Sequence, residues 1–190
     1  DATGVPDVGA KVAPDAMKNK KHVVMLNVET DVVIGPYLKK LAAKEGVIYT
    51  GSAGDEPGAV MELYSFAKAM GMNVEVMGKG KNNKLDYDCN PDTVLEEATR
   101  RVMSPKMLCA FKDGTKTMVE MTAMSNYTGL VPDVIGGHGP QTSPGTEGIK
   151  ELNDILKLKK DGGILNKHGV VEYVNGVAPG VFVKIGRAHV

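Results

Sequence analysis

Four polar side chains in the segment 78–83 could handle an anion. Lys79, Lys81, Asn82 and Asn83 follow one another within five positions, with a glycine before each lysine. Ammonium and amide groups donate hydrogen bonds to a phosphate, a carboxylate or a developing oxyanion, and glycine lets the backbone approach a ligand. The same composition is also typical of a solvent-exposed turn. We therefore weigh two interpretations, an anion-handling loop with substrate contacts at both asparagines and a plain surface turn.

The two lysines also suit acid–base chemistry. Hydride transfer to or from a carbon that bears oxygen requires a group that moves a proton and stabilises the alkoxide, and a lysine of lowered pKa does both. Two neighbouring cations repel, which lowers one pKa and leaves the other lysine as a fixed clamp. We expect Lys79 to transfer the proton because it lies nearer the predicted strand 73–77, with Lys81 as the second catalytic candidate.

Acidic residues lie where predicted strands end. Asp55 is of a residue type that commonly caps a helix, whereas the adjacent Glu56 is the better substrate-binding candidate. Asp113 and Lys116 are further catalytic candidates in and after a turn. Lys116 and Glu120 are also four residues apart, so an ion pair within one helix is an equal alternative. No compact ligand spacing occurs, and we assign no metal.

His138 lies between glycines in a loop-like segment, 136–148. A histidine in such a segment is a candidate for substrate contact, or a loop residue without chemical function.

Hydrophobic periodicity predicts the elements that must position these residues. Helix 6–19, strand 22–27, a helix that starts at Gly35-Pro36 and ends at Gly46, and strand 47–50 alternate as in a parallel sheet covered by helices. This predicts an α/β fold that begins with part of a Rossmann-like sheet. Beyond it we expect helix 55–70, a helix from Asn90 with Leu95, Ala98 and Val102 buried, two helices around 113–115, and strands 170–174 and 181–183.

These elements indicate four regions. We expect residues 1–50 to be the end of a dinucleotide-binding domain, 51–160 a catalytic α+β domain, and 161–184 a β segment that leads to a further domain. Residues 185–190 have the sequence that a common sequencing adapter would encode, which predicts read-through in an environmental gene, and an ordinary tail of the same sequence is the alternative. The opening without Met predicts missing upstream sequence.

Composition excludes several classes of protein. The 190 residues carry 23 basic and 23 acidic side chains, with 5% aromatic residues and no Trp, which disfavours nucleic-acid binding. Cys89 and Cys109 lack the spacing of a zinc site or a disulfide framework, so we expect a reducing cytoplasm. No apolar run is long enough for a membrane span.

Eight segments of the sequence together resemble the homoserine dehydrogenase-like oxidoreductases. This group includes the deoxyxylulose-phosphate-reductoisomerase-like enzyme and proteins with a carboxy-terminal SAF domain. The resemblance implies a Rossmann domain, a central catalytic and dimerising α+β domain, and a small β-rich carboxy-terminal domain. The matching segments are 2–6, 21–29, 54–57, the lysine-containing segment 78–83, 113–121, 129–133, 138–140 and 179–183.

The resemblance also implies NAD or NADP as cofactor and a homodimer. Thr3, Gly4, Asn27 and Glu29 are the expected cofactor contacts within the matching segments. The Gly-x-Gly-x-x-Gly fingerprint of such domains does not occur in the chain, so we expect residues 1–190 alone to bind NAD(P) weakly or not at all. The favoured function is an oxidoreductase that acts on a small hydroxy or keto compound, phosphorylated or carboxylated. The alternative is a noncatalytic module that binds an anionic metabolite and dimerises.

Overall fold

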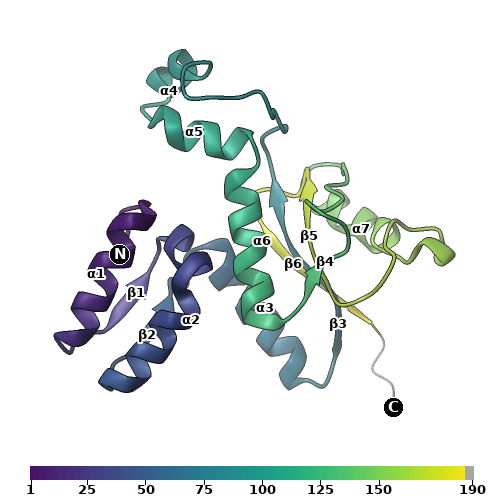
Figure 1. The fold of residues 1–190 in the computed structure, drawn as a ribbon. Helices are drawn as coiled ribbons and strands as arrows, with labels where there is room; N and C mark the ends of the chain where they lie inside the picture. Colours follow the sequence, from purple (N-terminus) through teal and green to yellow (C-terminus); the bar gives the residue numbers. More distant parts are fainter. Residues whose placement is uncertain (187–190) are drawn as a thin grey trace.

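The computed structural model describes residues 1–186 and shows a mixed α/β fold, as predicted (Figure 1). The predicted read-through at 185–190 falls largely outside these residues. No helix in the described range is long and apolar enough to cross a membrane.

The first unit, residues 1–51, is a two-stranded parallel sheet with two helices. Val23 pairs with Tyr49, and the small core contains Met17, Leu38 and Ala42. Its elements are α1 (Pro6–Lys18), β1 (Val23–Met25), α2 (Val28–Glu45) and β2 (Tyr49–Gly51).

The second unit is built on a four-stranded sheet of order β4-β5-β3-β6. Strand β3 is parallel to β5 and antiparallel to β6. Helix α6 stands between this sheet and the first unit (Figure 1). The elements are α3 (Glu56–Ala69), β3 (Asn73–Lys81), α4 (Leu95–Arg100), α5 (Pro105–Lys112), α6 (Thr115–Thr128), β4 (Val131–Pro132), α7 (Gly145–Ile155), the 3-10 helix η1 (Lys159–Asp161), β5 (Val170–Asn175) and β6 (Val181–Gly186).

Each face of the four-stranded sheet has its own core. Met77 packs with residues of α3 and α6 on one face, and Val76 packs with Leu152 and Leu156 on the other. The register of β3 against β6 shifts between Val74 and Val76, which marks a bulge. The bulge places Val74 on the same face as Met77, whereas simple alternation would place it with Val76.

The predicted loop 78–83 is wrong over residues 78–81, because β3 continues through Lys81. Both glycines serve the packing of backbones. A Cβ atom on Gly78 would lie 2.0 Å from the Glu172 carbonyl oxygen, and one on Gly80 would lie 1.7 Å from the Val177 carbonyl oxygen. The alternation therefore directs the glycines to one face of the sheet and the lysines to the other.

Helix α2 begins earlier than predicted. Asn27 is its N-cap and accepts a hydrogen bond from the Thr30 amide at 3.3 Å, so Pro36 lies inside the helix. The prediction treated Pro36 as a start signal and overlooked the asparagine cap. Its carboxyl end at Gly46 is confirmed, with the glycine in the left-handed conformation.

Helix α4, in contrast, is shorter than predicted, and Ala98 is its buried residue, as predicted. Leu95 is 53% exposed and Val102 is 94% exposed, so both predictions of burial are wrong. Val102 lies beyond the helix end with φ of 54°, which turns its side chain away. The 136–148 segment ends in α7, which the prediction assigned to loop.

Candidate active site

Lys79 is the centre of a buried ionic cluster. Its ammonium group lies 2.9 Å from Oε1 of Glu56 and also pairs with Glu120. The side chains of Lys79 and Glu120 are only 8% and 2% exposed. Helix α3 supplies Glu56 from its first residue, and α6 supplies Glu120 from its buried stripe. Burial penalises both charges, so this arrangement requires the pairing.

The cluster places a carboxyl group in the range of acid–base catalysis. Burial raises the pKa of Glu120 to about 7, although Lys79 opposes the shift. Burial opposes the charge of Lys79, but Glu120 and Glu56 together raise the pKa of this lysine. A carboxyl group that titrates near neutrality can both donate and accept a proton there.

Lys81 points to the same face but has different neighbours. Its ammonium donates to the Phe111 carbonyl oxygen at 2.7 Å. Burial and the charge of Lys79 lower the pKa of Lys81, while Asp113 opposes this. The expected division is therefore reversed, since Lys79 is the fixed cation and Lys81 the lysine of lowered pKa. Carboxylates lie closer to Lys79 than to Lys81, and this difference decides the direction in which each lysine pKa shifts.

The alternative of an ion pair between Lys116 and Glu120 within α6 is wrong. Lys116 pairs instead with Glu29 on α2, at 3.1 Å, and Glu120 pairs with Lys79. Asp55, the N-cap residue of α3, lies at the edge of this group and makes no side-chain capping bond. Burial raises the pKa of Asp55, and Lys116 opposes the shift.

Three acids of this cluster form the one place in the described range where a metal could find three protein ligands. Asp55, Glu56 and Glu120 each bring one oxygen atom within 4.8 Å of the others. The Lys79 ammonium already supplies a positive charge to two of them. We therefore continue to assign no metal.

The expected cofactor contacts lie together at the carboxyl end of β1. The Asn27 side chain donates to Thr3 Oγ1 at 3.2 Å, and Gly4 adopts a positive φ of 62°. Glu29 follows on the first turn of α2. In open α/β sheets, ligands bind outside the carboxyl ends of the strands, so this position fits a cofactor role.

The other predicted site residues lie at the periphery. Asp113 ends α5, and its carboxylate accepts from the Thr115 amide at 2.7 Å. Asn82 and Asn83 follow β3 and contact each other at 3.2 Å. Neither asparagine contacts the Lys79 cluster directly.

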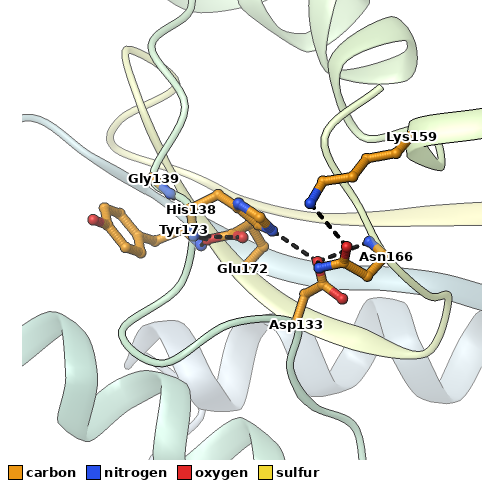
Figure 2. A network of polar contacts seen from close by, with 7 residues as sticks. All are labelled: Asp133, His138, Gly139, Lys159, Asn166, Glu172 and Tyr173. Carbon is orange, nitrogen blue, oxygen red and sulfur yellow. Dashed lines mark hydrogen bonds and ion pairs between the residues drawn. The ribbon is translucent and has the colours of Figure 1, made fainter. Parts of the chain in front are cut away.

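His138 belongs to a separate polar network (Figure 2). Its ring Nε2 lies 2.8 Å from Asp133 Oδ2, and its backbone amide donates to Glu172. Glu172 is on the sheet face opposite Lys79 and is fully buried. Figure 2 shows the His138 ring directed towards Asp133 and Asn166, away from Tyr173. The structure therefore does not bring His138 to the lysines.

This network holds its two carboxylates by hydrogen bonds. Glu172 accepts from the amides of His138, Gly139 and Tyr173, at 2.9 to 3.2 Å. Although burial opposes it, hydrogen bonds from His138 and Asn166 lower the pKa of Asp133. Such a network orders the 133–140 segment against β5.

Glu120 is the buried acid of this cluster that the sequence interpretation did not consider as a proton donor. The buried stripe of α6 also contains Thr117, Ala123 and Met124, at helical spacing from Glu120. A glutamate within an apolar stripe is rarely buried without a partner. The position of Glu120 in this stripe could therefore have indicated that a cation distant in sequence pairs with it.

A comparison with family models adds an assignment to this geometry. The model described as "Oxidoreductase DRL, catalytic domain" matches residues 54–189. The chain belongs to this oxidoreductase family. The matched region contains Lys79, Glu56 and Glu120, so the buried ionic cluster lies within the matched catalytic domain. Glu29, the partner of Lys116, lies before it. A search of curated proteins gives no match.

Proposed function

We propose that the chain carries the proton-transfer centre of an NAD(P)-dependent oxidoreductase that acts on a small hydroxy or keto compound. The observation that carries this proposal is the burial of Lys79 between Glu56 and Glu120, with the pKa of Glu120 raised to about 7. Membership of an oxidoreductase family supports a redox reaction.

A bound nicotinamide cofactor would supply or accept the hydride at the carbon that bears the reacting oxygen. Glu120 gives a proton to that oxygen during reduction and takes it back during oxidation. Lys79 stabilises the alkoxide by its fixed charge. This changes the role expected for Lys79, from proton donor to electrostatic stabiliser.

Lys81 is the group we propose for an anionic part of the substrate. Its ammonium has a backbone carbonyl as its hydrogen-bond partner, whereas Lys79 has two carboxylates. Of the two lysines it is therefore the one with less of its charge compensated at close range. A phosphate or carboxylate is the substrate group that such a cation would recognise.

The intact protein is proposed to follow the plan of the homoserine dehydrogenase-like oxidoreductases. In this plan the chain dimerises, and a SAF-like domain follows the catalytic domain. Thr3, Gly4, Asn27 and Glu29 would contact the cofactor. Their position at the carboxyl end of β1 supports this proposal.

The test is an NADPH-oxidation assay of the full-length enzyme with a panel of keto acids and sugar phosphates. We expect Glu120→Gln to lower kcat by ~100-fold or more and to remove an apparent pKa near 7 from the pH profile. Lys81→Ala should raise KM for anionic substrates, with a smaller effect on kcat. Lys150→Ala, an exposed lysine on α7, is the matched control. Normal turnover of Glu120→Gln would exclude the assigned role.

A further inference from the structure

Asp31 on α2 joins two tyrosines that come from different parts of the fold. Its side chain is buried, and its residue is 8% exposed. The Tyr49 hydroxyl donates to Oδ1 and the Tyr127 hydroxyl donates to Oδ2, both at 2.5 Å. A Cβ atom on Gly35 would lie 2.6 Å from Oδ1, so the glycine one turn later leaves room for this carboxylate.

Only one of these hydrogen bonds connects the two units. Tyr49 is on β2, in the same unit as Asp31, whereas Tyr127 is in the last turn of α6. The pair of Lys116 and Glu29 forms a second polar contact between α6 and α2. Residues near the two ends of α6 therefore hold the first turn of α2, which lies beside α6 in Figure 1.

The buried apolar clusters do not connect the units. The cluster around Met17 and Leu38 contains only residues of the first unit, and the other three clusters contain only residues of the second. A cavity of about 700 Å³ lies between parts of the two units. It is lined by Asp31 and its two tyrosines and by Met61 and Ser65 of α3. Relative motion is the default expectation for units that are joined by polar contacts without a shared core.

We propose that the hydrogen bond between Asp31 and Tyr127 is a latch that sets the angle between the N-terminal unit and the catalytic unit. Tyr127 is 41% exposed, so its hydroxyl can leave Asp31 for water without unfolding either core. Tyr49 keeps the carboxylate in place when the latch opens, because its own bond lies within one unit.

The latch has a consequence that rests on the proposed function. The expected cofactor contacts Asn27 and Glu29 are on the N-terminal unit, whereas Lys79 and Glu120 are on the catalytic unit. An open latch would separate the cofactor from the proton-transfer centre. Tyr127 is then a positioning residue, since it contacts neither of the reacting groups.

The two tyrosines offer a matched pair of variants. Tyr127→Phe and Tyr49→Phe each remove one hydroxyl from the same carboxylate, but only Tyr127→Phe breaks the bond between the units. We would place spin labels at Lys18→Cys and Lys150→Cys, both exposed, with the native cysteines replaced by alanine. Pulsed electron spin resonance then measures the distance distribution between the units in chain 1–190.

We expect Tyr127→Phe to broaden this distribution and Tyr49→Phe to leave it unchanged. Lys116→Ala breaks the second contact and should broaden it as well, which provides another variant if Tyr127→Phe does not fold. Equal distributions in Tyr127→Phe and the parent chain, or equal broadening by both tyrosine variants, would overturn the latch.

Kinetics separate the latch from the proposed chemistry. In the full-length enzyme we expect Tyr127→Phe to lower kcat by ~10-fold or more, with the apparent pKa near 7 retained, because misplacement slows the reaction without changing Glu120. Tyr49→Phe should keep parental kcat, and loss of kcat in both variants would refute a positioning role specific to Tyr127. The spin-label distances need no turnover, so they test the latch even if the proposed reaction proves wrong.

Discussion

Replacing Lys79 with methionine would leave the Glu120 carboxyl group buried without its cation. Removal of one partner from a buried ion pair costs ~3–5 kcal/mol of unfolding free energy. The Glu120 side chain is only 2% exposed, so water cannot replace the Lys79 ammonium group as its partner. The variant should therefore fold with Glu120 protonated, and its stability should depend on pH.

The direction of this pH dependence follows from the proton affinity of Glu120 in the folded and unfolded states. The pKa of Glu120 rises from an ordinary 4.5 to about 7 in the folded chain, so the folded chain holds this proton more strongly than the unfolded one. The resulting stability is complete below pH 4.5 and is lost as the pH rises through about 7. Without Lys79 the folded pKa is higher still, and the loss continues above pH 7.

The difference between parent and Lys79→Met should therefore grow by ~1.4 kcal/mol per pH unit above pH 7. Urea unfolding followed by circular dichroism between pH 6 and pH 9 measures it. Lys150→Met, which removes an exposed ion pair, should cost at most ~1 kcal/mol at each pH. Lys79→Met/Glu120→Gln should lose the added pH dependence. A destabilisation that stays constant from pH 6 to pH 9 would refute the coupling between Lys79 and Glu120.

Two further predictions concern the four-stranded sheet. Gly80→Ala should cost at least ~2 kcal/mol in thermal or urea unfolding, because its Cβ atom would lie 1.7 Å from the Val177 carbonyl oxygen. Gly54→Ala, where the nearest atom is 4.0 Å away, should change stability by less than ~0.5 kcal/mol, and equal effects would contradict the close approach. Glu172→Gln should cost ~1–3 kcal/mol, because an amide cannot accept from three backbone donors as a carboxylate does. Hydrogen exchange of the His138 amide should then accelerate, and unchanged protection would argue against this network as the anchor of its loop.

The sequence predicted the class of the fold and several helix ends, because these depend on local signals. The two α helices around 113–115 and the glycine end of α2 follow from capping and turn chemistry within a few residues. The start of α2 was missed because a proline outweighed an asparagine cap. Local sequence patterns were therefore sufficient to predict a helix end where a single capping or turn signal occurred.

The site was harder to predict, because its contacts are distant in sequence. Lys79 was identified by type, but its partner Glu120 is 41 positions away, and the partner of Lys116 is 87 positions away. Spacing favoured a pair of Lys116 with Glu120, and tertiary packing separated them. His138 was a candidate for substrate contact only because of its glycine-rich loop, whereas its observed partners are Asp133 and the β5 residue Glu172.

The bulge in β3 determines which face of the sheet each later side chain of the strand occupies. Val74 and Met77 share a face although they are three residues apart, because the bulge takes up one residue. If residues 74–77 alternated regularly with Val74 in its present layer, Lys79 would enter the apolar layer formed with α7, and a glycine would lie opposite Glu120. Deletion of Glu75 would remove the bulge and still leave Lys79 on its present face, so at the present length of the strand the bulge itself places the ionic cluster.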